Sequence, residues 1–194
     1  MNSSTDVAND TVVSSDAEML ILVDADDVEI GQQTKAVCHD GAGLLHRAFS
    51  LFVFNTAGEV LLQQRSRTKR LWPGYWANTC CSHPRHNETM QTATQRRLQQ
   101  ELGFTCDLEY VYKFTYHATY QQHGSERELC WVYVGVSDLP VRPNPHEIED
   151  WRFMPPDELD TALANDPEQF TPWLQMEWAR LRGEFADRLP IPRS

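Results

Sequence analysis

Two apolar runs joined by a short polar turn constrain the fold more than any other feature of the sequence. They lie in AFSLFVFNTAGEVLLQQR, residues 48–65, where aromatic and β-branched residues flank the turn Asn55–Gly58. Such residues favour strands, and a polar stretch ending in glycine between two of them is typical of a hairpin. The chain is therefore predicted to be built around a β-sheet.

Other segments predict the remaining elements. Strand composition recurs in EMLILVDADD (18–27), LEYVYKFTYHATY (108–120), ELCWVYVGV (128–136) and EIEDWRFM (147–154), and the second and third flank a polar turn at 121–127. Helix formers fill 89–102 ahead of Gly103, and two more helices are predicted after Pro155 and within 170–189. This order predicts an α/β fold of the α+β kind, a mixed β-sheet sandwiched between helices.

The start of the chain differs in composition from the rest. Residues 1–17, MNSSTDVANDTVVSSDA, are small, polar and acidic, so ordering them would cost backbone entropy with little apolar surface to bury. We predict a disordered tail over 1–17 and a single domain over 18–194, a length that one hydrophobic core can support.

Charge restricts the partners. The chain carries a net charge of −11 and its lysines are Lys35, Lys69 and Lys113. Nucleic acids and anionic membranes would be repelled at long range, so neither is expected, and no obligate protein partner is predicted. Surfaces rich in acid and poor in lysine suit concentrated salt, where self-repulsion is screened, which leads to the hypothesis of a halophilic source.

Cysteine usage and hydropathy predict the compartment. The five cysteines are an odd number, no secretory pattern is visible, and no apolar run reaches the length of a membrane span. A cytoplasmic location is expected.

Residues 77–88, ANTCCSHPRHNE, gather cysteines and histidines in a stretch predicted to be a loop, because Pro84 and polar neighbours interrupt any regular period. Histidine nitrogens with carboxylate oxygens suit zinc, manganese or iron. Glu126 and Glu128 are two apart at the mouth of a predicted strand, where alternate residues face one side. We predict a metal site with the candidate ligands His39, His46, His83, Glu126 and Glu128.

A structural zinc site is the alternative for the same region. It would use Cys38, His39, Cys80 and Cys81, although adjacent cysteines rarely fit the spacing that zinc ligands adopt.

A basic segment precedes this region. RSRTKR, residues 65–70, holds four basic residues in six positions, and Lys35 and Arg97 could join it in space. A solvated loop is the ordinary explanation of such a run. On an acid-rich chain, however, the segment is suited to a phosphate-bearing ligand, which arginine binds through two parallel donors.

Several separated motifs carry a resemblance to a known family. KAVCH, LLHRAFS, LLQQRSRTKRLWPGYWANTCCSHP, RRLQQELG, FTYHA, EREL and FTPW occur in this order from about residue 19 to 185. The sequence thus resembles the type I isopentenyl-diphosphate isomerases, a branch of the Nudix superfamily. The resemblance implies a Nudix-type fold and an isomerase of isoprenoid biosynthesis that interconverts isopentenyl diphosphate and dimethylallyl diphosphate through a carbocation.

The resemblance also implies roles for residues. The proton-transfer pair would be Cys81 and Glu128, with Tyr116 supporting the glutamate. The five candidate ligands would bind one divalent ion, Mn²⁺, Zn²⁺ or Mg²⁺, and Glu101 would hold a second ion, Mg²⁺, that bridges to the diphosphate. The diphosphate contacts would be Lys35, Arg65, Lys69 and Arg97, and Trp173 would face the carbocation.

These roles agree with the chemistry that the reaction needs. An alkene is a weak base, so its protonation requires a well-placed acid and stabilisation of a tertiary cation, which an indole face provides. Spacing does not choose between Cys80 and Cys81; the register of the family motif selects Cys81. Trp72, Tyr75 and Trp76 are candidate walls that exclude water, although aromatic residues are more often core.

The stretch RRLQQELG departs from the motif of hydrolytic Nudix enzymes. Arg97 and Gln100 stand where those enzymes have glutamates, and the small residue expected near His86 is missing. Magnesium ligands are thereby lost, which disfavours hydrolysis. A hydrolase of nucleoside or other diphosphates remains the main alternative, and a non-catalytic, zinc-stabilised binding module is the alternative from another class.

Overall fold

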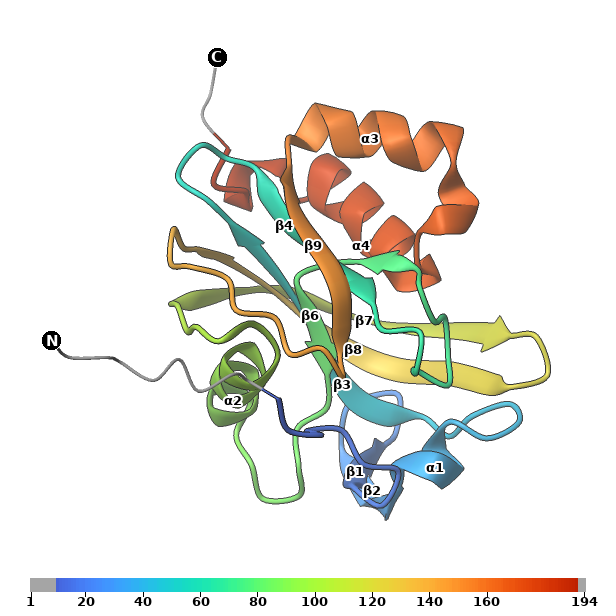
Figure 1. Ribbon diagram of the computed structural model, residues 1–194. Coiled ribbons are helices and arrows are strands. Elements are labelled where there is room, and N and C mark those ends of the chain that lie inside the picture. Colours follow the sequence, from blue (N-terminus) through green and yellow to red (C-terminus); the bar gives the residue numbers. More distant parts are fainter. Residues whose placement is uncertain (1–9, 192–194) are drawn as a thin grey trace, which may run out of the picture.

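The computed structural model describes residues 10–191 and contains a nine-stranded mixed sheet with helices on its faces (Figure 1). The strands are β1 Met19–Val23, β2 Glu29–Thr34, β3 His46–Phe54, β4 Val60–Arg65, β5 Trp76–Ala77, β6 Cys80–Ser82, β7 Leu108–Tyr120, β8 Gly124–Val136 and β9 Ile148–Met154. The helices are α1 Lys35–Cys38, α2 Met90–Leu102, α3 Pro156–Asn165 and α4 Pro172–Gly183, with 3₁₀ turns at Pro167–Gln169 and Ala186–Arg188.

The predicted hairpin at 48–65 is confirmed at its turn, but its strands separate. β3 and β4 pair only at Phe54 and Val60. Beyond that point β3 runs parallel to β8 from His46 to Phe54, and β4 pairs antiparallel with β9. A strand that pairs in parallel is normally covered on both faces, which explains why β3 is an almost continuous apolar run.

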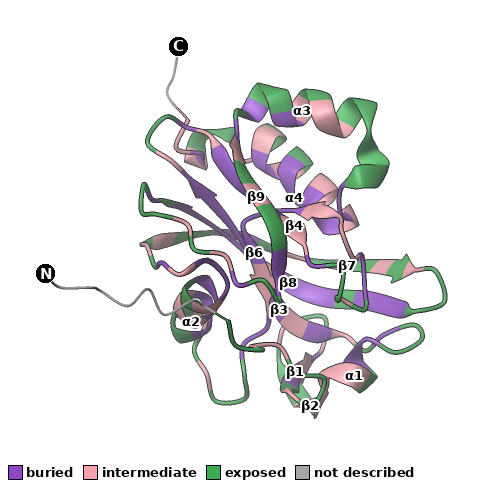
Figure 2. Ribbon diagram, in the orientation of Figure 1, coloured by how far each residue is buried: buried purple, intermediate pink, exposed green. Residues whose placement is uncertain are grey.

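Alternate residues of β3 reach two different cores. Phe49 and Leu51 belong to the cluster under α2, which includes Leu98, whereas Phe52 packs under α4 with its ring centroid 6.1 Å from that of Trp178. Figure 2 shows buried strands between the helices on either side. The period of two along β3 therefore builds both halves of the sandwich, and the predicted fold class is confirmed.

Local signals set both ends of α2, and the end at Gly103 was predicted. The hydroxyl of Thr89 accepts a hydrogen bond from the backbone N–H of Thr92 at 3.2 Å, which caps the first turn. Gly103 ends the helix with φ 75°, a conformation that side chains with a Cβ atom disfavour.

Two predictions of irregular structure are corrected. The predicted loop at 77–88 contains strand β6, in which Cys81 lies opposite Ser50 of β3. The predicted turn at 121–127 is shorter, because β8 begins at Gly124 and places Glu126 inside the strand. Neither segment has a β pattern of its own: β6 becomes a strand by pairing with β3, and the start of β8 by pairing with β7.

Residues 10–17 lie against the domain, so its contacts begin before residue 18. The backbone carbonyls of Thr11 and Val13 accept hydrogen bonds from Asn144 and Arg97, each at 2.8 Å. The predicted tail at 1–9 lies outside the described residues. Within 10–191 no helix is long and apolar enough to cross a membrane.

Candidate active site

A cavity of about 630 Å³ brings together almost all of the predicted site residues. It is lined by Lys35, His39, Arg65, Lys69, Cys81, His83, Arg97, Glu101, Tyr116, Glu126, Glu128 and Trp173. The exception is His46, which is fully buried and lies directly against His83 and Glu128. Residues from every predicted motif, between Lys35 and Trp173, thus meet at one place.

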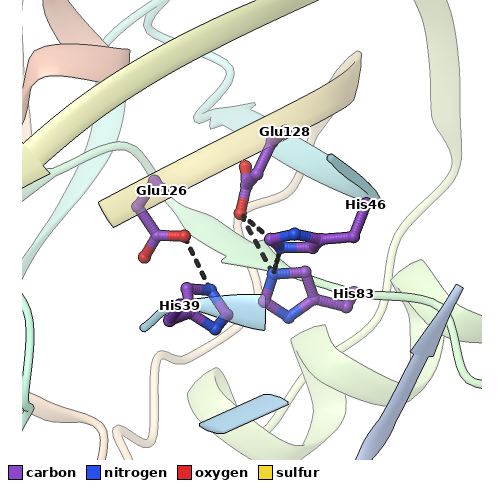
Figure 3. Close-up of side chains that lie close together, drawn as sticks. All are labelled: His39, His46, His83, Glu126 and Glu128. Atoms are coloured by element: carbon purple, nitrogen blue, oxygen red, sulfur yellow. Dashed lines mark hydrogen bonds and ion pairs between the residues drawn. The ribbon is translucent and has the colours of Figure 1, made fainter. Parts of the chain in front are cut away.

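Three histidines and two glutamates form one cluster at one end of the cavity (Figure 3). One candidate ligand atom from each residue lies within 4.8 Å of all the others. The Nε2 atoms of His46 and His83 are 3.2 Å apart, and Nε2 of His83 is 3.0 Å from Oε1 of Glu128. The cluster contains no cysteine, and the thiol of Cys38 lies near the backbone carbonyl of Gln33, so the alternative zinc site is not supported.

The backbone fixes which nitrogen of two of the imidazole rings faces the cluster. Nδ1 of His39 lies 2.8 Å from the carbonyl of Lys35, and Nδ1 of His46 lies 2.7 Å from that of Leu44. A carbonyl only accepts, so each Nδ1 carries hydrogen, and in the neutral ring the lone pair is on Nε2. Both lone pairs therefore point into the cluster, which is the usual arrangement of histidines that bind metal.

The arrangement of donors fits a divalent cation. Nε2 of His39 is 2.7 Å from Oε2 of Glu126, and this buried oxygen has no hydrogen-bond partner. With hydrogen on Nδ1, two electron pairs face each other across this contact, and only a proton or a metal ion between them removes the repulsion. Burial lowers the pKa of His39, but the nearby carboxylate of Glu126 raises this pKa overall. An environment that attracts positive charge and offers nitrogen and oxygen donors suits a metal ion.

Glu128 is held in its ionised form between this cluster and the cavity. The hydroxyl of Tyr116 donates a 2.7 Å hydrogen bond to Oε2, while Oε1 faces His83. Burial opposes ionisation, but hydrogen bonding and the charge of His46 lower the pKa of Glu128. Conversely, burial and the charge of Glu128 raise the pKa of Tyr116, which remains a donor. Tyr116 faces Glu128 directly across the β7–β8 ladder, which explains the contact.

Strand β6 separates the two adjacent thiols that spacing could not distinguish. Successive side chains of a strand point to opposite faces. Cys80 is fully buried under α2, whereas Cys81 lines the cavity. The Cys81 thiol donates to Oδ1 of Asn78 at 2.8 Å and lies 3.4 Å from Oγ of Ser50. Its pKa is raised well above the usual value, mainly by burial.

A second group of residues that line the cavity, called here its cationic end, carries cations that are paired with acids. Lys69 contacts Glu147, and Arg97 contacts both Glu101 and Glu147. Burial lowers the pKa of Lys69 to about 8, despite the attraction of Glu147. Burial also opposes the charge of Arg97, but the two carboxylates raise the pKa of that guanidinium overall.

The segment before β1 reaches the same end. Nζ of Lys35 donates to the hydroxyl of Ser14 at 2.5 Å, and Arg97 donates to the carbonyl of Val13. Val12, Ser14, Ser15 and Asp16 also line the cavity. Residues that the sequence assigned to a tail therefore contact two predicted diphosphate ligands.

An aromatic side chain, that of Trp173, forms part of the cavity wall. The ring of Trp173, at the start of α4, is 2% exposed, and the guanidinium of Arg65 lies 5.2 Å from its centroid. Trp72 packs edge-on behind Trp173 at 5.2 Å, so it supports the wall. Trp76 contacts a different cluster, the one beneath α4, so its predicted role as a wall is not supported.

Several polar residues beside the site were not predicted. Glu147 faces Lys69 and Arg97, Asn78 and Ser50 contact Cys81, and Glu177 is buried behind them. Asn78 lies three residues before Cys81, a spacing visible in the motif. No local pattern marks the others, because strand pairing and helix packing bring them to the site.

Comparison with known proteins agrees with this geometry. A family model of the NUDIX domain matches residues 44–174. Among solved structures, DR0079 from Deinococcus radiodurans aligns with a TM-score of 0.70, at 21% identity over 84% of this chain and 98% of that one. The fold and the site thus define a protein with a NUDIX domain.

Relatives of higher sequence identity identify the family within the proteins that have a NUDIX domain. The chain is 40% identical to Isopentenyl-diphosphate Delta-isomerase 1 of Photorhabdus laumondii over 89% of this chain and 99% of that protein. It is 44% identical to Isopentenyl-diphosphate Delta-isomerase of Serratia proteamaculans, over 84% and 97%. The chain belongs to the isopentenyl-diphosphate Delta-isomerase family.

Proposed function

We propose that this protein interconverts isopentenyl diphosphate and dimethylallyl diphosphate in isoprenoid biosynthesis. The observation that carries the proposal is that one cavity contains a thiol, Cys81, and an ionised carboxylate, Glu128, together with a cluster of cations. The reaction needs one group that adds a proton to the five-carbon unit, one that removes a proton, and an anchor for the diphosphate.

In the proposed mechanism, Cys81 and Glu128 exchange protons with the substrate. Protonation of the terminal alkene carbon consumes the π bond and leaves a tertiary cation on the adjacent carbon. Loss of a proton from the carbon on the other side of the cation then forms the new double bond, so one proton enters and one leaves. In the reverse reaction the two residues exchange roles, and Tyr116 keeps Glu128 oriented throughout.

Trp173 stabilises the cation in this proposal. An indole face attracts positive charge by roughly 0.5 to 2 kcal/mol and does not attack it. The ring is almost completely buried and lines the cavity, so it also restricts access of water, which would otherwise capture the cation.

The diphosphate occupies the cationic end in this proposal, held by Lys35, Arg65, Lys69 and Arg97, and Glu101 would hold a Mg²⁺ ion that neutralises part of its charge. The remote diphosphate supplies binding energy that holds the small reactive group in place. A divalent ion, Mn²⁺, Zn²⁺ or Mg²⁺, bound by His39, His46, His83, Glu126 and Glu128 would polarise Glu128 and bias its proton affinity.

The direct test is incubation of the protein with isopentenyl diphosphate and Mg²⁺ in deuterated water. We expect dimethylallyl diphosphate that carries deuterium, because protonation draws on exchangeable hydrogen. Recovery of the starting compound without deuterium would contradict the proposal. Release of phosphate from nucleoside diphosphates would instead favour the hydrolase alternative.

We also propose that the protein acts in the cytoplasm of a halophilic organism, without an obligate protein partner. The support is the net charge of −11 and the scarcity of lysine. Stability and activity as a function of salt test this proposal.

A further inference from the structure

Glu177, in α4, is a buried carboxyl group close to the Cys81 thiol that has no role in the mechanism above. Its side chain is fully buried. Oε1 lies 3.4 Å from the thiol of Cys130, whereas Oε2 has no hydrogen-bond partner. Burial raises the pKa of Glu177 to about 8, with a smaller contribution from the charge of Glu128. The group is therefore mainly neutral at pH 7 and ionises within the range in which enzymes are assayed.

A continuous line of contacts joins this carboxyl group to Cys81. Sγ of Cys130 lies 3.4 Å from both Oε1 of Glu177 and Oγ of Ser50. Oγ of Ser50 lies 3.4 Å from Sγ of Cys81. Ser50 is 1% exposed and Cys130 is fully buried, so bulk water does not reach these contacts. In such surroundings a change of charge on Glu177 acts with little screening.

The hydroxyl of Ser50 has one hydrogen and two competing acceptors. It can donate to the sulfur of Cys81 or toward the carboxyl group of Glu177, and hydrogen bonding with Ser50 lowers the pKa of Glu177 by favouring its ionised form. An ionised carboxylate is the stronger acceptor, because hydrogen bonds to charged groups are about twice as strong as neutral ones. Its charge also raises the pKa of Cys81. Both effects disfavour a thiolate at Cys81.

We propose that Glu177 is a positioning residue for Cys81: its neutral carboxyl group leaves the hydroxyl of Ser50 directed at the sulfur, and its ionised form withdraws that hydroxyl. This proposal rests on the proposed isomerase function, in which Cys81 exchanges a proton with the substrate. Glu177 is not among the residues that line the cavity. Its protonation determines whether the hydroxyl of Ser50 is directed at the sulfur of Cys81, which lies 3.4 Å away.

Other ionisable groups face Glu177 from the strands that pack against α4. They are Cys81 on β6, Tyr112 and Tyr116 on β7, and Glu128 and Cys130 on β8. Replacing Glu177 by glutamine leaves all of them in place and removes a single titration. A comparison of the two proteins therefore isolates the contribution of Glu177.

The first measurement is kcat as a function of pH for the wild type and Glu177→Gln. If only the neutral form supports turnover, wild-type kcat falls about tenfold between pH 7 and 9. Glutamine is neutral at every pH and similar in size, so the variant should change less than about twofold over that range. The same decrease in both proteins would overturn the proposal.

The second measurement does not depend on isomerase activity. Alkylation of Cys81 by iodoacetamide, followed by mass spectrometry, reports its thiolate. We expect the ratio of the Glu177→Gln rate to the wild-type rate to rise several-fold between pH 7 and 9. A constant ratio would overturn the inference even if the protein is an isomerase, and a rising ratio would support it even if the protein lacks isomerase activity.

The Ser50→Ala variant distinguishes the effect of the Ser50 hydrogen bond from the effect of the charge on Glu177. In the Ser50→Ala background the effect of Glu177→Gln on the pH dependence of alkylation should be smaller, because only the direct effect of the Glu177 charge remains. If Glu177→Gln has its full effect on alkylation in this background, Ser50 does not transmit that effect, and the proposal is overturned. If Glu177→Gln does not fold, Ser50→Ala provides the test alone: kcat should fall several-fold at pH 7, and an unchanged kcat would contradict the role.

Glu184→Gln is the matched control. It makes the same change in an exposed residue just after α4, which pairs with Arg180 outside the cavity. Its kcat and alkylation profiles should coincide with those of the wild type. A pH profile altered to the same extent as in Glu177→Gln would mean that the effect belongs to the helix rather than to the buried carboxyl group, and the proposal would fall.

Discussion

The two ends of the cavity are built in different ways. At the histidine end, backbone carbonyls hold two rings, and strand pairing places Glu126 and Glu128 on one face. At the cationic end, long side chains of Lys69 and Arg97 are held by carboxylates that also line the cavity. The histidine end is fixed by the backbone, so changes to the backbone should disturb it. The cationic end is fixed by ion pairs, so changes of pH or salt concentration should disturb it.

The largest effect on kcat is expected when one of the two proton-transfer groups is replaced. Cys81→Ala removes a proton-transfer group and should lower kcat by about 10³-fold or more. Cys80→Ala should retain most of the activity while lowering stability, because Cys80 is fully buried under α2. Steady-state kinetics and thermal unfolding of both variants check this. An inactive Cys80→Ala beside an active Cys81→Ala would refute the assignment of the two faces of β6.

A backbone change should disable the histidine end next. A Cβ atom on Gly124 would lie 2.1 Å from the carbonyl oxygen of His39, and the glycine has φ 137°. Gly124→Ala should therefore displace His39, weaken binding of a divalent ion at least tenfold and cost about 2 kcal/mol of stability or more. Isothermal titration calorimetry with Mn²⁺ and chemical denaturation measure the two effects.

Gly183→Ala is the control for that change. A Cβ atom at Gly183, the last residue of α4, meets nothing within 4 Å, so ion binding should be unchanged. Stability should be equal or slightly higher, since alanine favours the helix. Equal ion affinity in Gly124→Ala and the wild type would indicate that the histidine end is less rigid than the geometry implies.

The cationic end should respond to pH with a smaller effect. The pKa of Lys69 is lowered to about 8, so its charge is present below that pH and lost as pH rises through it. KM for isopentenyl diphosphate should rise about two- to tenfold between pH 7.5 and 9.5, in proportion to the lost ionic contact. Lys69→Arg keeps the charge throughout and should flatten this rise.

That change in KM is separable from the effect of Glu177, which we expect in kcat. A rise in KM that is identical in the wild type and Lys69→Arg would exclude Lys69 as its source. The Glu177→Gln variant should show the same rise in KM as the wild type, since Glu177 lies behind Cys81 rather than at the cationic end.

The smallest effect should come from salt acting on the surface. With a net charge of −11, self-repulsion should be relieved by about 2 M KCl, raising Tm by several degrees. Thermal unfolding across a salt series measures this. Highest stability and activity at low ionic strength would contradict the halophile hypothesis.

Local patterns were enough to predict most of the architecture. The caps of α2, the turn at Asn55–Gly58 and the apolar runs of β3 and β8 are short-range signals, and each predicted element was found. The strands β2, β5 and β6 were not predicted, because their conformation follows from pairing with a partner strand rather than from composition. The same holds for the early start of β8.

The sequence by itself determined which residue types are available to the site, since the motifs supply the histidines, glutamates, cysteine and cations that now share one cavity. Spacing did not distinguish the two adjacent thiols, and the register of the family motif selected Cys81, which the tertiary structure places at the cavity. Only the tertiary structure decided that Glu147 and Glu177 belong beside that cavity. The reason is physical: a side chain's direction and its distant neighbours follow from strand register and helix packing, which bring together segments far apart in the chain.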